Sequence, residues 1–319
     1  MKWQGRRQSS NIEDRRGQRG GGLGGLGGLG GLGGNPFGRG GGIRLPTGGG
    51  GGRGSRGGIG GIVGIVIVLG LVWLFTGTNP LDMLTGGGST NSAPSSRSSS
   101  QLPTSGEQSE LRQFVGVVVG ETEDLWSNVF AQQNEDYPEP TVVLFTGGTD
   151  TGCGAADSST GPFYCPADQQ VYIDLSFYDQ LRDQFGAPGD FAQAYVLAHE
   201  IGHHIQNITG VLPEFNQRRA SMSQEDANAY SVRVELQADC YAGVWANYAN
   251  QENILDGGDI EEALNAAEQI GDDTLQRRMQ GFAVPKTFNH GTSAQRQTWF
   301  DRGYRSGNPG DCDTFSGTV

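Results

Sequence analysis

Cysteine and histidine are both scarce in this sequence, with four of each among 319 residues. The two closest cysteines, Cys153 and Cys165, are separated by eleven intervening residues, and no C-x-x-C pair occurs. This spacing argues against a zinc site built from cysteines and against a thiol redox centre. The few histidines are therefore the first place to look for metal chemistry.

Basic residues are also few, and they are unevenly placed. The sequence has 22 Lys and Arg against 35 Asp and Glu, for a formal net charge of −13. Residues 1–58 hold ten basic residues against Glu13 and Asp14, a balance of +8 that leaves −21 for the remainder. Glycine-rich repeats without a collagen-like proline pattern predict a disordered, basic cytoplasmic tail over residues 1–57. Its charges either contact anionic lipid or nucleic acid or are simply solvated.

One long run lacks charge altogether. Residues 59–75 read IGGIVGIVIVLGLVWLF, and with their neutral flanks they predict a transmembrane helix over residues 58–78. No clear small-x-small cleavage site follows, which favours a retained anchor over a cleaved signal peptide. Because the nearby positive charges precede the run, we expect a single-pass inner-membrane protein with its N-terminus in the cytoplasm and its main domain periplasmic or otherwise extracytoplasmic.

After a predicted Ser/Gly/Pro linker over residues 79–108, residues 109–319 are expected to form one domain. Periodicity predicts a helix over 110–133, strands over 141–147 and 170–175, and mostly helices beyond them. The strand over 170–175 is a candidate edge strand for binding an extended peptide. The fold class is therefore α+β, mainly helical with a small β-sheet.

The export prediction makes disulfides possible, and four cysteines permit three pairings. We expect Cys153 with Cys165, which closes a Gly/Ser-rich loop. We also expect Cys240 with Cys312, which pins the C-terminal segment to a helix.

The most informative stretch is DFAQAYVLAHEIGHHIQN, residues 190–207. His199 and His203 lie four residues apart, so on a helix their imidazoles share one face and can bind one metal ion. Glu200 then lies beside the ion, where it can hold and deprotonate a metal-bound water. Asp190 and Gln193 resemble a capping box at the start of this helix, and Gly202 suggests a close backbone approach.

A catalytic zinc usually has a third protein ligand. The predicted helix that follows Ser223 carries Glu235 and Asp239 on one face among small residues, which predicts packed carboxylates. Glu235 is the candidate third ligand, and Asp239 is the candidate acceptor for a ligand imidazole. The alternative is an ordinary charged helix face beside Arg233.

These motifs carry a resemblance to known families. H-E-x-x-H followed by E-x-x-A-D resembles the gluzincin arrangement of Ste24-type zinc peptidases. The runs GPFYCPADQQVYIDLSFYDQL, AYVLAHEIGHHIQ, VELQADCYAGVW and HGTSAQRQTWFDRGY, with KWQGRR and EDRR at the start, resemble the bacterial neutral zinc metallopeptidase family of YpfJ type. The resemblance implies one Zn²⁺ per chain and a zincin-like fold.

His290 and Arg296 have the spacing of the H-P-x-x-x-x-R element of Ste24-type peptidases, with Gly291 in place of proline. The resemblance implies that they lie near the zinc and help to bind the developing oxyanion, a role that needs preorganised donors. The alternative is that His290 and Thr292 merely cap a helix. His204 is turned about 100° from its neighbour around the helix, which favours a supporting or surface role.

The sequence therefore predicts a membrane-anchored zinc metallopeptidase. His199, His203 and Glu235 bind the metal, Glu200 is the general base, and His290 stabilises the intermediate, with Asp239 and Arg296 in support. Its partners are a peptide or protein substrate and the membrane, without specific nucleic acid. The alternatives are a non-catalytic, zinc-stabilised cell-envelope binding module and an interaction protein that works through its glycine-rich tail. Glu200 favours the enzyme, because a structural site has no use for a general base.

Overall fold

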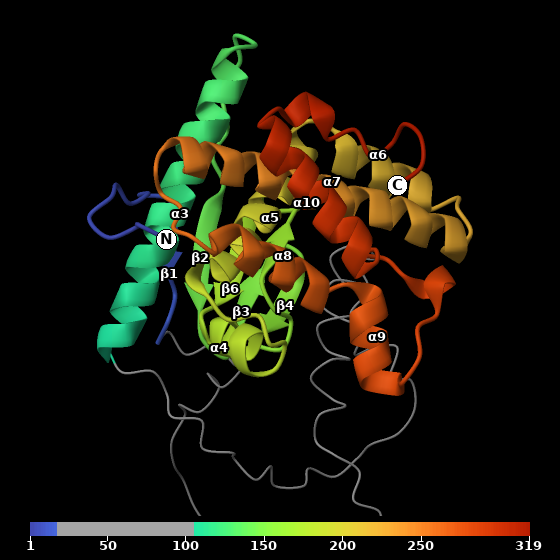
Figure 1. Ribbon diagram of the computed structural model, residues 1–319, viewed down its shortest axis with the longest axis horizontal. Coiled ribbons are helices and arrows are strands. Elements are labelled where there is room, and N and C mark those ends of the chain that lie inside the picture. The colour runs from blue at the N-terminus through green and yellow to red at the C-terminus, as the bar shows by residue number, and fades with distance from the viewer. Residues whose placement is uncertain (18–104) are drawn as a thin grey trace, which may run out of the picture.

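The computed structural model describes residues 1–17 and 105–319 (Figure 1). The predicted transmembrane helix over 58–78 and residues 79–104 of the predicted linker lie outside the described residues. The described chain is mainly helical with a small sheet, as the sequence predicts. Within residues 1–17 and 105–319, no helix combines the length and the apolar character that crossing a bilayer requires.

The elements are, in chain order, β1 Ile12–Asp14, α3 Ser105–Ala131, β2 Thr141–Phe145, β3 Gly148–Thr151, β4 Gly154–Asp157, β5 Phe163–Cys165, β6 Gln170–Asp174, α4 Ser176–Asp183, α5 Asp190–Ile208, α6 Val211–Arg219, α7 Gln224–Gln251, α8 Asp259–Gln269, α9 Asp272–Gln280, η1 Pro285–Thr287, α10 Ser293–Ser306 and η2 Pro309–Asp311. Because α3 begins at Ser105, the folded region starts inside the predicted linker.

The main sheet has the order β1-β2-β6-β5. β1, β2 and β6 run parallel, whereas β5 is antiparallel to β6. The two central strands are buried on both faces, which explains their continuous apolar runs. The prediction of an edge strand over 170–175 is wrong, because β6 is paired on both sides. The edge next to α5 is β5.

Residues 1–17 fold against the domain. β1 pairs with β2, with Ile12 opposite Val142. Trp3 is buried, and its ring lies 5.6 Å from that of Phe114 on α3 in an edge-to-face contact. The prediction of a disordered tail is therefore wrong for residues 1–17. The glycine repeats that suggested it begin only after this segment, and its pairing partner is distant in the sequence.

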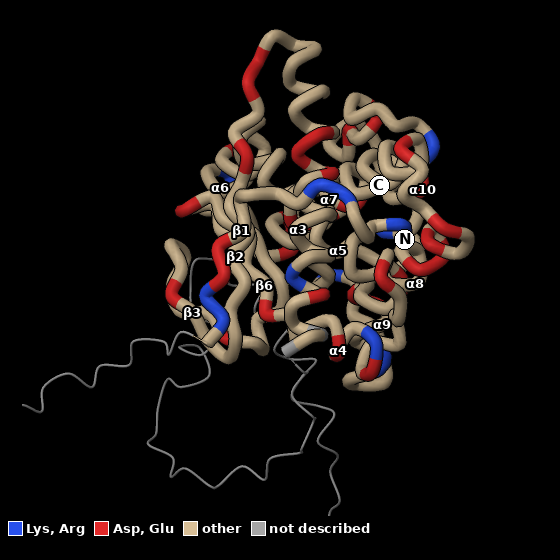
Figure 2. The backbone as a smooth tube through the Cα atoms, turned by 90° about the vertical axis from the view of Figure 1, so that its left-hand side faces the viewer, with Lys and Arg blue, Asp and Glu red and all other residues tan. Residues whose placement is uncertain are grey.

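Two basic residues of this segment pair with acidic residues of α3. Arg6 Nε lies 2.6 Å from Glu121 Oε1, and Arg7 Nη2 lies 2.8 Å from Asp124 Oδ1. These two charges are thus held by the protein itself and are not available as free basic charges of a tail. Figure 2 shows acidic positions along many of the domain's elements, consistent with its negative balance.

The helices that build the core cross closely. α5 packs against α7, α8 and α3, and α7 packs along α10. A Cβ at Gly202 of α5 would lie 3.1 Å from Cα of Ala238 on α7, so glycine here permits the predicted backbone approach. A Cβ at Gly243 would lie 2.1 Å from the carbonyl oxygen of Phe300, so α7 and α10 also meet backbone to backbone. These two contacts hold α5 against α7 near Ala238 and α10 against α7 near Gly243.

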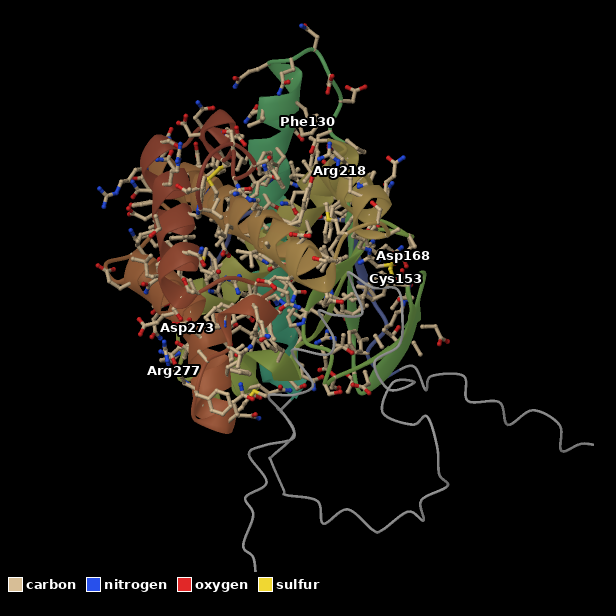
Figure 3. The ribbon with its side chains drawn as sticks, turned by 90° about the vertical axis from the view of Figure 1, so that its right-hand side faces the viewer. Phe130, Cys153, Asp168, Arg218, Asp273 and Arg277 are labelled. Carbon is tan, nitrogen blue, oxygen red and sulfur yellow. A yellow bond between two sulfur atoms is a disulfide. The ribbon has the colours of Figure 1, made fainter. Side chains whose placement is uncertain are left out.

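Both predicted disulfides are present. Cys153 is bonded to Cys165 and Cys240 to Cys312. The first closes the loop that runs from Cys153 through β4 to the end of β5, and Figure 3 labels Cys153 beside Asp168. The Asp168 carboxylate accepts hydrogen bonds from the Gly152 main chain at 2.6 Å and from the Tyr172 hydroxyl at 2.7 Å. The second bond ties α7 to the segment after η2.

Candidate metal centre and active site

α5 presents the two motif histidines from the interior of the protein. Its N-cap is Gly189, so Asp190 is the first helical residue and the predicted capping box is wrong. The Asp190 carboxylate instead accepts from the main-chain nitrogen of Met1 at 3.1 Å, and the Phe191 amide is capped by Glu262 from α8 at 3.0 Å. The helix start is therefore fixed by tertiary partners. His199 and His203 follow on one buried face.

α7 brings the candidate third ligand to the same point. Ser223 caps this helix by accepting from the Asp226 amide. Glu235 is 1% exposed, and ligand atoms of His199, His203 and Glu235 all lie within 4.8 Å of one another. The burial excludes the alternative of an ordinary solvated helix face.

The distances within this cluster suit a small tetrahedral cation. Nε2 of His199 lies 3.2 Å from Oε2 of Glu235, and Nε2 of His203 lies 3.5 Å from Oε1. Ligand atoms at about 2.0–2.2 Å from one tetrahedral zinc are about 3.3–3.6 Å apart. The donor set also matches zinc, which binds imidazole nitrogen and carboxylate oxygen.

Buried polar atoms around the cluster add a second test of the fit. Oε2 of Glu200, Oε1 of Glu235 and Nε2 of His290 are buried without a hydrogen-bond partner among the described residues. Such atoms are costly unless a ligand satisfies them. All three residues line one cavity together with His199. The residues present therefore fit a metal ion and its reacting ligands.

Asp239 supports the first histidine. His199 Nδ1 donates to Asp239 Oδ1 at 2.8 Å, which fixes the ring and leaves Nε2 facing Glu235. Arg296 of α10 donates to both Asp239 oxygens at 2.8 Å, and the Tyr195 hydroxyl donates at 2.6 Å. Burial opposes ionisation of Asp239, but Arg296 and His199 hold its pKa well below the usual range. Arg296 thus acts through Asp239.

The second histidine has its own support, from Gln206. His203 Nδ1 donates to Gln206 Oε1 at 2.8 Å. The amide nitrogen of Gln206 in turn donates to the Val234 carbonyl at 2.6 Å, which fixes the orientation of the amide. His204 faces away from this cluster and donates from Nε2 to the Pro138 carbonyl at 2.6 Å. Its role is to join α5 to the segment before β2.

Glu200 lies at the boundary between the ligand cluster and the cavity. It is 4% exposed, and burial raises its pKa to about 8 in the metal-free protein. The attraction of His199 opposes that shift, and a bound cation would oppose it further. Glu200 is therefore placed to hold and release a proton at this point.

His290 enters the same cavity from the segment between η1 and α10. Its Nδ1 donates to Asp272 Oδ1 at 2.9 Å, and the other Asp272 oxygen accepts from the main-chain amides of Asn289, His290 and Gly291. Burial disfavours the charged imidazole, but the Asp272 carboxylate outweighs it and raises the pKa of His290. Thr292, not His290, caps α10.

The structure thus brings every predicted chemical residue to one region, and it adds three that the sequence analysis missed. Tyr195 lies one helical turn before His199, and Gln206 lies one turn after His203, so both are on the ligand face of α5. Helical spacing alone could therefore have indicated both residues. Asp272 lies 18 residues before His290 at the start of α9, and no local pattern connects the two.

Comparisons with known proteins point to one family. The family described as "Putative neutral zinc metallopeptidase" matches residues 1–315. "Uncharacterized protein YpfJ" of Escherichia coli is 44% identical over 319 residues, which cover all of both chains. "Uncharacterized protein Mb2605" of Mycobacterium bovis and "Uncharacterized protein Rv2575" of Mycobacterium tuberculosis are each 49% identical over 191 residues, covering 56% of this chain and 64% of the relative. No solved structure matches the chain. The chain belongs to the neutral zinc metallopeptidase family.

Proposed function

We propose that this protein is a zinc-dependent peptidase that hydrolyses peptide bonds with Glu200 as general base. His199, His203 and Glu235 would hold one zinc ion, with Asp239 and Gln206 orienting the imidazoles. When bound, zinc supplies Lewis-acid chemistry that lowers the pKa of water and polarises a carbonyl. The buried carboxylate of Glu200 takes a proton from the attacking water and delivers it to the leaving amine.

His290 would complete the site as an oxyanion donor. Asp272 fixes its ring through Nδ1 and favours the protonated imidazole, so Nε2–H can donate to the oxygen that becomes negative. Arg296 holds Asp239 in place and would not reach the substrate as a free charge. The proposal of a zincin-like fold is supported by three elements that meet here: the helix α5 with the two histidines, the strand β5 beside it, and the helix α7 with Glu235.

One observation carries the proposal. Glu200, a carboxylate that no structural zinc site needs, is buried beside three metal-ligand candidates and lines the cavity. Its Oε2 atom has no hydrogen-bond partner among the described residues. A zinc site that only stabilises a fold is closed by four ligands. This cluster offers three and a general base.

The proposal is tested by metal content and cleavage of a peptide library, using the full-length protein because residues 1–17 pack on the domain. The expected result is one zinc per chain, cleavage that stops on removal of the metal by a chelator, and recovery when zinc is added. One tightly bound zinc without cleavage of any peptide would overturn the peptidase proposal and favour the non-catalytic binding module.

We further propose that the folded region works outside the cytoplasm, attached to the membrane through residues 59–75. The two disulfides support an oxidising compartment. Residues 1–17 pack on the domain of the same chain. The predicted single crossing does not fit this packing, because it would put residues 1–17 and the domain on opposite sides of the membrane. We therefore place both on the extracytoplasmic side.

Membrane-impermeant maleimide tests this topology on intact cells. A cysteine at the exposed Ser10 should be labelled without lysis, as should one at the exposed Ser221 within the domain. Labelling at residue 221 alone would restore the single crossing with a cytoplasmic N-terminus.

A further inference from the structure

An apolar cavity opens directly beside the catalytic cluster. Its volume is about 60 Å³ for a water-sized sphere, and it is partly open to solvent. Its walls come from separate elements: Phe177 from α4, Val196 from α5, Ile270 after α8 and Leu275 from α9. The segment before β5 closes another side through Gly161.

The polar groups of this cavity belong to the catalytic machinery. Apart from Thr160, its lining residues with polar side-chain groups are Tyr195, His199, Glu200, Glu235, His290 and Arg296. Arg296 is the only arginine or lysine among them, and both oxygens of Asp239 already occupy its guanidinium. The wall away from the ligand cluster therefore offers no fixed charge to neutralise a charged guest.

The cavity has two kinds of lining. Glu200 and His290 supply the polar groups that would act on a peptide bond, while Val196 and Leu275 supply apolar surface to the same cavity. Val196 lies one helical turn before Glu200 on α5, so the apolar wall and the general base are held by the same rigid element. A side chain attached next to the attacked bond would enter this space.

We propose that the cavity is the specificity pocket of the enzyme and receives a large aliphatic or aromatic side chain next to the scissile bond. The inference rests on the proposed peptidase function. Cleavage then occurs beside residues such as Leu, Ile, Met and Phe, and an Asp or Lys at that position is rejected because its charge would be buried without a partner. The substrate class is peptides or unfolded protein segments with an apolar residue at the cut.

The first experiment compares peptides that differ at one position. The full-length zinc-loaded protein is given a series of blocked peptides with Leu, Phe, Ala, Asp or Lys at the position next to the cleaved bond, and product ends are read by mass spectrometry. We expect kcat/KM to be at least about tenfold higher for Leu or Phe than for Ala, because a few methylenes in an apolar pocket discriminate to that extent. Equal rates for Leu, Asp and Lys would overturn the proposal.

Two substitutions test whether these walls set the preference. Val196→Phe fills the cavity from α5 and should shift the preference from Phe and Leu to Ala. Ile270→Lys, at a half-buried position, adds a positive charge and should raise the kcat/KM ratio of the Asp peptide to the Leu peptide. Phe282→Lys is the matched control, since Phe282 is 60% exposed and outside the cavity lining. An equal change in the kcat/KM ratio of the Asp peptide to the Leu peptide in the control and test variants would refute the assignment.

Binding to the Glu200→Gln variant separates failure of the pocket from failure of the peptidase function. The same peptides are titrated into this zinc-loaded variant by calorimetry. Binding that favours Leu and Phe, and that Val196→Phe abolishes in the same background, supports the pocket even when the parent cleaves nothing. Binding without side-chain preference, or none at all, overturns it.

Discussion

Replacement of Asp239 by Asn should weaken both the fold and the metal site, for different reasons. Asp239 is fully buried and accepts from His199, from Tyr195 and twice from Arg296. Asn keeps the shape but removes the negative charge. The guanidinium of Arg296, which is 3% exposed, then has no counter-ion among its contacts.

The magnitudes follow from these contacts. Breaking a buried ion pair by removing one partner costs about 3–5 kcal/mol, because the other charge stays buried. Loss of the carboxylate behind a ligand histidine lowers metal affinity by about 10–100-fold. The double variant Asp239→Asn with Arg296→Met removes both charges, so it should recover at least half of the lost stability. Its zinc affinity should stay low, since His199 still lacks its carboxylate.

Both quantities can be measured on the same preparations. Denaturant unfolding with a chelator present gives the stability of the metal-free protein, and competition with a chromophoric chelator gives zinc affinity. Should the single variant fail to fold, the double variant still supplies both numbers. Stability of Asp239→Asn within about 1 kcal/mol of the parent would show that Arg296 does not depend on this carboxylate. Zinc affinity restored by Arg296→Met would refute the link to His199.

Three further predictions concern other parts of the structure. Trp3→Ala should lower the free energy of unfolding by about 3–5 kcal/mol in denaturant melts, because the ring packs on Phe114, and an unchanged midpoint would mean that residues 1–17 do not hold the fold. Glu235→Gln should sharply reduce zinc content by elemental analysis, and unchanged stoichiometry would remove it from the ligand set. Asp272→Asn should lower kcat with zinc content unchanged, since it leaves the metal ligands intact but releases His290, and a full kcat would argue against an oxyanion role.

The sequence could place the candidate metal ligands on shared helix faces because helical geometry is local. Two histidines four residues apart, and two carboxylates four residues apart, are fixed on one face as soon as each helix forms. Local spacing could not predict that α5 and α7 pack against each other. Gly202 gave the one hint of it, through the cost of glycine in a helix interior.

The N-terminal segment was misread because its structure depends on distant partners. β1 is only three residues long and has no stable partner until β2 is reached in the chain. Composition dominates the prediction, because the glycine-rich sequence that follows favours disorder and no change in charge separates residues 1–17 from it. Asp272 was missed for the same reason, because its link to His290 joins the start of one helix to a loop.

The role of Glu200 as general base is tested most directly by the kinetics of the Glu200→Gln variant. Parent and variant, both full length and both shown to carry one zinc, are compared on the best peptide from the library. We expect kcat/KM to fall by about 10²–10⁴-fold with zinc content unchanged, because only the general base is lost. Equal turnover by parent and variant would contradict it.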